Sequence, residues 1–293
     1  MAIIPQLIAN GIIAGGIYAL IAVGYSLIYT ILKFINFAHG EMVMFGAFIG
    51  WVFVMQFQQH IIIAALIAML CCGLMGYIIE KIAYKPLRKK NKLYVLLTAI
   101  AMSFLLQGIA ILIFGAKVRT FSTGQIAEGH DILGAIMTNT QLTIIVVSLI
   151  LLLIITCAIK KTKIGKAIRA VADNQETAQA VGIPVDKIIS IVFIASSMIA
   201  AVSGILIGYE QNMTPTMGVM LGVKAFTAAV VGGIGNVYGA FLGGYIIGLA
   251  ENLGIIFLPA GYKDAIAFII LMIMLYWRPT GLLGKKTEEE VRS

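Results

Sequence analysis

Long apolar runs, each close to the length that crosses a lipid bilayer, fill most of this chain. A spanning helix needs about 20 predominantly apolar residues. The candidate runs are Pro5–Leu32, Glu41–Phe57, Ile61–Ile79, Leu93–Gly115, Gln141–Ile159, Ile188–Gly208, Gly218–Gly235, Val237–Phe257 and Tyr262–Trp277. With 60% hydrophobic and 12% charged residues, the 293-residue chain is more apolar than a soluble core of that size requires. The sequence therefore predicts an all-α, polytopic transmembrane helical bundle that forms one domain over residues 1–293.

A glycine-rich stretch makes the number of spans ambiguous. Residues 232–236 read Gly-Gly-Ile-Gly-Asn, and they interrupt the apolar sequence between Gly218 and Phe257. Such an interruption fits either a turn between two spans or the break between two half-helices. We therefore expect about eight or nine spans in total.

Basic residues are concentrated in short segments beside the ends of the apolar runs. These segments are Lys81–Lys92, Lys160–Arg169 and Arg278–Arg292, in a chain of net charge +8. By contrast, Ala116–Thr140 contains Lys117 and Arg119 against Glu128 and Asp131. The positive-inside rule places the basic segments, including a tail at 278–293, in the cytoplasm and residues 116–140 outside. Basic residues at span ends fit topology signals and anionic lipid headgroups, so no nucleic-acid partner is expected.

The sequence lacks the patterns of the enzymes and metal proteins that such a chain could resemble. It has no Walker A motif, and no Gly-x-Ser-Gly with a partnered histidine inside a span. Cys71, Cys72 and Cys157 all fall inside apolar runs, which indicates neither a disulfide framework nor a zinc site. No basic residue precedes Lys33, so the first run is expected to remain as a span. We expect no catalytic activity, no cofactor and no metal.

A long polar segment, Lys160–Lys187, lies between two of the apolar runs. Its apolar residues recur at helical spacing, and these are Ile168, Val171, Ala178 and Val181. Its charged residues fall mostly on the other side, and these are Lys166, Arg169, Asp173 and Glu176. Arg169 and Asp173 are spaced as i, i+4 partners. Gly182 provides a helix stop and Pro184 cannot continue the helix, so the pattern predicts one short surface helix.

Two functions fit such a helix on a membrane protein. It can offer a docking surface to a soluble cytoplasmic partner, or it can lie on the lipid surface as basic amphipathic helices do. The acidic side chains of Asp173 and Glu176 on its polar face argue mildly against the lipid surface.

Polar residues inside or beside the apolar runs are the candidates for a substrate path. They are Asn36, Glu41, Gln107, Glu251 and Asn252. Lipid cannot satisfy their hydrogen bonds, so each faces water, substrate or a neighbouring helix, and the sequence leaves this choice open. The first run is followed by little polar sequence, so we expect the chain to break within or near the membrane around Asn36 and Glu41.

Two further patterns in the apolar runs have simpler interpretations. Lys224 stands within an apolar run, and its long stem could reach the membrane interface by snorkelling. Small residues recur four positions apart at Gly11, Gly15 and Ala19, and again at Gly239 and Gly243. Such spacing favours close helix packing.

Several motifs resemble a known membrane-protein family. They are Leu-Lys-Phe-Ile-Asn-Phe-Ala-His-Gly-Glu at 32–41, Lys-Ala-Phe-Thr-Ala-Ala-Val-Val-Gly-Gly-Ile-Gly-Asn at 224–236 and Arg-Pro-Thr-Gly-Leu-Leu-Gly at 278–284. They resemble the LivH-type permease family of branched-chain amino-acid ABC importers, from the first span to the tail. The spacing Glu-x-Ala-x-x-x-Gly over 176–182 is similar to the loop by which bacterial ABC permeases engage their ATPases. On this resemblance the ATPase-coupling residues are Arg169, Asp173, Glu176, Thr177, Ala178 and Gly182, although Thr177 stands where alanine is usual.

The resemblance implies a permease subunit of the bacterial inner membrane that imports branched-chain or related small amino acids by alternating access. Its implied partners are a LivM-like second permease, two cytoplasmic ABC ATPase subunits and a periplasmic substrate-binding protein. One alternative is a permease for urea or short amides within the same family. Another is a lone gradient-driven carrier or channel, which would normally show paired intramembrane charges, and few charges lie within these runs.

Overall fold

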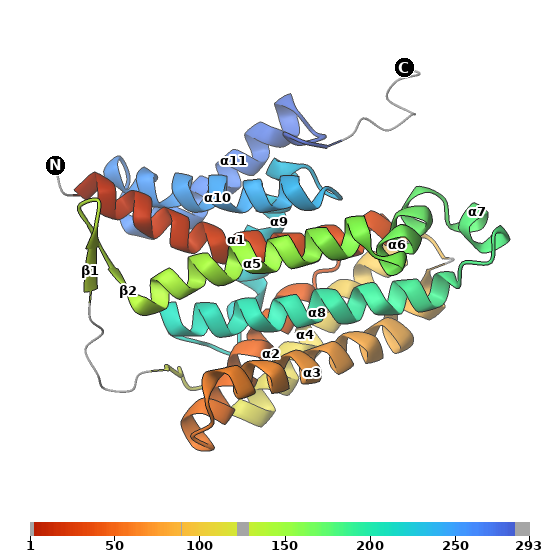
Figure 1. The fold of residues 1–293 in the computed structure, drawn as a ribbon, viewed down its shortest axis with the longest axis horizontal. Coiled ribbons are helices and arrows are strands. Elements are labelled where there is room, and N and C mark those ends of the chain that lie inside the picture. The colour runs from red at the N-terminus through yellow and green to blue at the C-terminus, as the bar shows by residue number, and fades with distance from the viewer. Residues whose placement is uncertain (1–2, 89, 122–128, 285–293) are drawn as a thin grey trace.

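The computed structural model describes residues 3–88, 90–121 and 129–284, and helices dominate it (Figure 1). The longest helices, α1 (Ile3–Leu32) and α8 (Val185–Glu210), are largely buried and form the centre of the bundle. The other apolar helices are α2 (His39–Trp51), α3 (Ile61–Ile79), α4 (Lys92–Phe114), α5 (Asn139–Lys161), α9 (Met217–Gly232), α10 (Val237–Leu253) and α11 (Lys263–Trp277). Short π- and 3₁₀-helical turns extend α2 to Gln56, α3 to Leu87 and α10 to Ile256, and one at Ala260–Tyr262 precedes α11.

Every predicted apolar run forms a helix, but the helices differ in length. Within the described residues, six helices are long and apolar enough to cross a membrane by length and composition. The runs that correspond to α2, α9 and α11 form shorter helices of 13, 16 and 15 residues. Three of the nine apolar runs thus form helices that are shorter than the six long ones.

The glycine-rich stretch at 232–236 forms a tight turn between two helices. Gly233 and Gly235 adopt φ values of 109° and 89°, which glycine tolerates at no steric cost. The turn reverses the chain, so that α10 packs back along α9 with Gly239 against Gly232 and Gly243 against Ala228. Helices α9 and α10 thus form a helical hairpin, in which α10 with its extension to Ile256 is long enough to cross a membrane and α9 is shorter.

Small residues allow α1 and α10 to approach closely. Gly15 lies against Tyr245 and Gly248, and Ala19 lies against Gly244. A side chain at any of these glycines would meet the backbone of the opposite helix. The prediction that the four-residue spacing serves helix packing is confirmed.

The chain between α1 and α2 turns back into the bundle. The His39 ring packs on Tyr25, with ring centroids 4.7 Å apart, and it occupies the space beside Gly24. Gly24 stands eight positions before Leu32, or about 12 Å along the helix. Helix α2 therefore begins inside the bundle, as expected from the scarcity of polar sequence around Asn36.

The two ends of the bundle differ in charge and in structure. At the end that we call the basic end, Lys85 pairs with Asp186 at 2.8 Å, and Arg88 pairs with both Glu80 and Asp186 at 3.1 Å. At the opposite end, which we call the hairpin end, β1 (Gly129–Ile132) and β2 (Ala135–Thr138) form an antiparallel pair. Figure 1 shows this hairpin beside the start of α1, where Gln6 exchanges hydrogen bonds with the backbone of Ile136.

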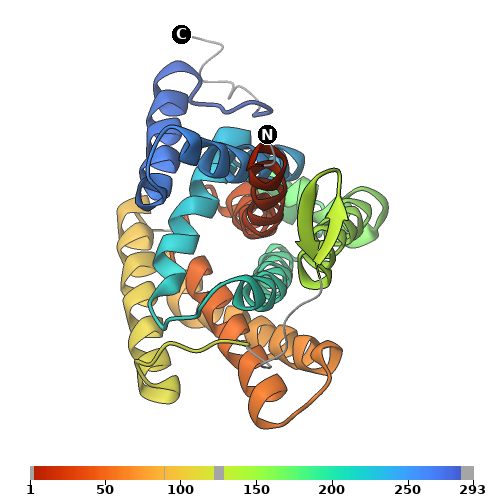
Figure 2. The same cartoon turned by 90° about the vertical axis from the view of Figure 1, so that its left-hand side faces the viewer.

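The outer helices expose apolar side chains. Helices α3, α4 and α5 lie at the edge of the bundle in Figure 2, and most of their residues are not covered by the rest of the chain. The exposed positions include Leu70, Phe104, Leu112 and Leu153, each more than 60% accessible. Surfaces of this kind face lipid or a membrane partner.

Candidate functional site

A cavity of about 860 Å³ lies between α1, α8, α9, α10 and α11, and Gln141 at the start of α5 also contributes to its lining. Its rim is formed by Glu210, Gln211, Asn212 and Thr214, in the connection from α8 to α9 at the hairpin end. Ile17, Met217, Met220 and Leu221 contribute apolar lining. The cavity falls within the range of volumes that bind small molecules, and it combines apolar walls with a few charged groups, as ligand sites do.

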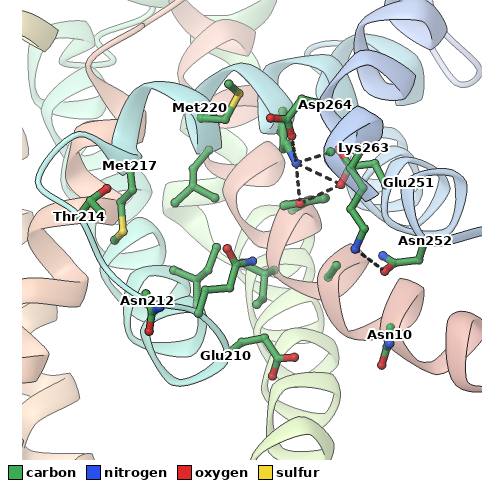
Figure 3. A pocket seen from close by; sticks show the side chains of 18 of the residues that line it. Asn10, Glu210, Asn212, Thr214, Met217, Met220, Glu251, Asn252, Lys263 and Asp264 are labelled. Carbon is green, nitrogen blue, oxygen red and sulfur yellow. Dashed lines mark hydrogen bonds and ion pairs between the residues drawn. The ribbon is translucent and has the colours of Figure 1, made fainter. Parts of the chain in front are cut away.

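Four residues from four helices meet in the wall of this cavity. The Lys224 ammonium on α9 lies 3.1 Å from Glu251 Oε1 on α10 and 2.7 Å from Asp264 Oδ1 on α11. The Tyr18 hydroxyl on α1 donates to Glu251 Oε2 at 3.0 Å and accepts from Lys224 Nζ at 3.3 Å. Figure 3 shows Glu251 and Asp264 converging on these shared interactions. We call Tyr18, Lys224, Glu251 and Asp264 the charged cluster.

The members of the charged cluster differ in their access to the cavity. The side chains of Glu251 and Lys224 are 2% and 11% accessible, whereas that of Asp264 is 45% accessible. Nearby, Lys263 Nζ donates to Asn252 Oδ1 at 3.0 Å (Figure 3). Glu251 and Asn252 both belong to the lining of the cavity.

The sequence suggested that Lys224 could reach the membrane interface by snorkelling, and the structure shows a different arrangement. Its ammonium is instead held inside the bundle by two carboxylates. Paired charges are favoured there because an isolated ion in such surroundings is costly. The sequence interpretation also missed Tyr18, Lys263 and Asp264, which lie on helices far apart in the chain from Lys224.

Glu41 and Gln107 form a second polar cluster, away from this cavity. Glu41 is fully buried at the first turn of α2, and its Oε1 accepts hydrogen bonds from Ser103 Oγ at 2.8 Å and from Gln107 Nε2 at 3.0 Å on α4. The carboxylate thus links α4 to α2. It also suits the positive end of the helix macrodipole, as its position at the start of a helix predicts.

Helices α2 and α9 begin side by side next to Glu41. Gly40 on α2 lies against Gly218 and Gly222 on α9, so closely that a Cβ atom at Gly40 would meet the α9 backbone. Gly218 also lies beside the Glu41 carboxylate. Helix α9 therefore separates the Glu41 cluster from the cavity.

Asn36 belongs to neither cluster. Its side-chain oxygen accepts from the Tyr84 hydroxyl at 2.5 Å and from the backbone of Ala38 at 3.2 Å. The path candidates thus divide into Glu251 with Asn252, Glu41 with Gln107, and Asn36 alone. Only the first pair lines the cavity.

The segment at 160–187 forms two helices where one was expected. They are α6 (Lys163–Asp173) and α7 (Gln175–Ala180). The break falls at Asn174, whose extended backbone ends α6 and whose side chain caps α7 by accepting from the Thr177 backbone at 2.9 Å. Asparagine is a strong N-cap residue, and this signal was overlooked in the helical pattern.

The two helices are attached to the bundle through their apolar residues. Val171 and Ala178 are buried, whereas Val181 is exposed and does not belong to the inner face. Gly182 follows α7 with φ of 84°, so the predicted glycine stop is confirmed. Asp173, Glu176, Thr177 and Gly182 are exposed at the basic end, which leaves them available to a partner.

Arg169 does not form the expected ion pair with Asp173. Its Nη1 donates instead to the backbone carbonyl of Ile159, near the end of α5. Arg169 therefore anchors α6 to a spanning helix. The last carbonyls of a helix are free acceptors, which explains why a nearby arginine prefers them.

These features define the class of the protein. A helical bundle with long apolar helices, an internal charged cavity and an exposed helical segment at one end is the architecture of a multi-pass membrane protein with a polar pathway. A family model described as "Branched-chain amino acid transport system / permease component" matches residues 7–275. The chain belongs to this family.

Individual relatives agree with the family model. The chain is 36% identical to the high-affinity branched-chain amino acid transport system permease protein LivH of Escherichia coli K12, over 98% of this chain and 97% of that protein. It is equally similar to the corresponding protein BraD of Pseudomonas aeruginosa, with the same coverage. The predicted permease class and the non-enzymatic role of the chain are confirmed. The chain is thus one component of an ABC transport system that has further components.

A solved structure shares the fold at low sequence identity. It is PsaBC from Streptococcus pneumoniae in complex with Fab, with a TM-score of 0.50 and 14% identity, over 96% of this chain and 93% of that one. The likeness supports the arrangement of the helices.

Proposed function

We propose that this chain is one of two permease subunits in an inner-membrane importer of branched-chain or related small amino acids. The basic end faces the cytoplasm and the hairpin end faces the periplasm. A binding protein delivers the amino acid at the rim of the cavity, and ATPase subunits drive the change between outward-facing and inward-facing states. The substrate follows from the transport systems named for the relatives.

The attachment of α6 and α7 to the ends of α5 and α1 is the observation that supports this proposal most strongly. Their outer face is exposed, while their inner face is connected to the bundle at several points. Arg169 bonds to the end of α5, and Gln175 Nε2 donates to the Ile31 carbonyl near the end of α1 at 2.8 Å. A push on this segment is thereby transmitted to helices that also line the cavity. We assign the ATPase contact to Asp173, Glu176, Thr177 and Gly182, with Arg169 and Ala178 as anchors.

Partners are proposed from the same surfaces. The apolar faces of α3, α4 and α5 provide area for a LivM-like second permease as well as for lipid. Two ATPases would bind the α6–α7 surface of this chain and its counterpart on the second permease. A periplasmic substrate-binding protein would contact the hairpin end.

Purification of the whole complex tests this function. Mild solubilisation of a tagged chain is expected to recover a second permease and two ATPases, and proteoliposomes made from the complex should take up L-leucine only with ATP and binding protein. The paired charges of the cavity make a lone gradient-driven carrier the second candidate. Leucine uptake by the isolated chain without ATP would establish that alternative.

A further inference from the structure

We propose that the charged cluster is the substrate-binding site within this subunit and that it recognises the zwitterionic head of an α-amino acid. This inference rests on the proposed function and adds to it a site and a recognition chemistry. In outline, Lys224 binds the substrate carboxylate and Asp264 binds its ammonium group, while Glu251 stays paired with Lys224.

The charged cluster lies inside the bundle, where a transport pathway is expected. Ionisable side chains inside a membrane bundle are costly, and they mark substrate or ion pathways. The charged cluster lies in the wall of the cavity, and four separate helices contribute to it. A site shared by α1, α9, α10 and α11 changes shape when these helices tilt, as a transport site must.

The two carboxylates around Lys224, those of Glu251 and Asp264, are unequally buried. Glu251 is almost inaccessible and is also held by the Tyr18 hydroxyl, whereas nearly half of the Asp264 side chain is exposed. A substrate that enters the cavity can therefore displace Asp264 from Lys224 more readily than it can displace Glu251. Its carboxylate takes the vacated place, and the released Asp264 carboxylate pairs with the substrate ammonium.

The charges around the charged cluster suit a substrate that carries one charge of each sign. Around the charged cluster, Lys224 and Lys263 are matched by Glu251 and Asp264, so these four groups add no net charge; the remaining acidic residue, Glu210, lies at the rim and accepts from Gln141. A zwitterion exchanges ion pairs without adding net charge, whereas a lone carboxylate or amine leaves one charge unpaired in a poorly solvated place. Urea and short amides offer no charge to replace Asp264 at Lys224. The cluster thus favours amino acids over the neutral solutes considered above.

The apolar part of the cavity wall suits an aliphatic side chain. Ile17, Met217, Met220 and Leu221 line the same cavity. Methionine is flexible and fills irregular apolar space, so this wall accommodates aliphatic side chains of different branching. Head-group recognition by charge and side-chain recognition by an adaptable wall fit a small family of aliphatic amino acids.

The test uses the reconstituted complex with leucine-loaded binding protein. Lys224→Met is expected to reduce leucine uptake per ATP hydrolysed by at least about tenfold, the scale of a lost hydrogen bond to a charged group. Lys224→Arg should retain more transport than Lys224→Met. Lys90→Met is the matched control, because Lys90 is exposed between α3 and α4, away from the cavity, the hairpin end and the α6–α7 surface, and it should behave as wild type.

A double variant separates recognition from structural pairing. Lys224→Met with Glu251→Gln removes one charge of each sign, so the fold loses no charge balance. If the cluster only joins helices, this variant should recover the transport lost in Lys224→Met, and the proposal would be overturned. If Lys224 binds the substrate carboxylate, the double variant should remain inactive while binding-protein-stimulated ATP hydrolysis persists.

Site occupancy can be measured directly on the complex without binding protein. In a background without native cysteines, L-leucine should protect Met220→Cys from a thiol reagent, and the protection should disappear when Lys224→Met is added. Neither 4-methylpentanoate nor isoamylamine should protect. Protection by either compound to the same degree as leucine would refute zwitterion recognition. Absence of leucine uptake by the wild-type complex would instead contradict the proposed function.

Discussion

Gln175, the first residue of α7, donates its side-chain amide to the backbone carbonyl of Ile31, one residue before the end of α1, at 2.8 Å. The bond joins an exposed surface helix to a largely buried helix at the centre of the bundle. Helix α1 also carries Tyr18 of the charged cluster. Tyr18 lies about 20 Å along the helix from Ile31, which is about two-thirds of the thickness of the hydrocarbon core. This single contact therefore connects the proposed ATPase surface to the proposed substrate site.

Gln175→Leu is expected to weaken this connection. A neutral hydrogen bond contributes about 0.5–1.5 kcal/mol, so leucine uptake per ATP hydrolysed should fall about two- to tenfold while the ATPases remain bound. Gln179→Leu is the control, because Gln179 is exposed on the same short helix. Equal behaviour of the two variants in proteoliposomes would show that the Gln175 bond does not transmit the ATPase motion.

Gly182→Val should interfere with ATPase docking. Gly182 has φ of 84°, and a β-branched residue there is strained by about 1–2 kcal/mol, which displaces the turn after α7. Gly115 has φ of 78° at the other end of the molecule, and neither glycine has an atom within 4 Å of its added Cβ. Gly115→Val is the control, because its φ of 78° and ψ of 169° lie in a region that is essentially restricted to glycine, so valine is strained there as well. Only Gly182→Val should reduce ATPase copurification.

Glu176→Lys reverses one charge on the exposed α7 surface that we assign to the ATPase contact. We expect normal membrane insertion with loss of leucine uptake and of substrate-stimulated ATP hydrolysis. Wild-type coupling in this variant, measured beside Gly182→Val, would indicate that α6 and α7 rest on lipid.

Gln107→Leu should loosen α4. It removes one of the two donors to the buried Glu41 oxygen, at a cost of about 1–3 kcal/mol. The melting temperature of the purified chain should fall, and adding Glu41→Gln should restore part of the loss because the buried charge is gone. Leu112→Ala, at an 86% accessible position on α4, is the control and should leave the melting temperature nearly unchanged. No rescue by Glu41→Gln would contradict the role assigned to this carboxylate.

The orientation can be tested by thiol labelling of intact cells. Cysteines at Lys90 and Lys166 should resist a membrane-impermeant reagent, and one at Lys117 should react, in a background without Cys71, Cys72 and Cys157. Lys89, Arg292 and Glu128, which also follow from the sequence pattern, lie outside the described residues. Labelling of Lys166→Cys from outside would reverse the assigned topology.

The positions of the helices were predictable because the bilayer imposes a length and a polarity on each one. Apolar runs such as Leu93–Gly115 and Gln141–Ile159 agree with α4 and α5 within a few residues. The glycine pairs of α1 and α10 were also predictable as packing residues, because small side chains have few other uses at helical spacing. The β1–β2 hairpin was not anticipated, since its four-residue strands are too short to produce a clear alternating pattern.

The candidate site could be predicted only in part. Glu251 and Asn252 were identifiable because polar residues within an apolar run need partners. Their partners were not identifiable, because the contact of Lys224 with Asp264 depends on how α9 and α11 cross in space. Asp264 stands in the first turn of its helix, where an acidic residue has an ordinary local explanation. The sequence pattern therefore gave no reason to connect it with Lys224.

The contact of Gly40 with Gly218 and Gly222 has a mechanical consequence. Without side chains between them, the starts of α2 and α9 cannot slide or rotate past one another without a backbone clash. The two helices thus share a pivot, with Lys224 about 9 Å along α9 from Gly218. We therefore expect a tilt of α9 that moves Lys224 away from Glu251 to move α2 as well and, through the hydrogen bonds of Glu41, α4. Movements at the rim of the cavity and on the far side of the bundle are thereby coupled through the contact of Gly40 with Gly218 and Gly222.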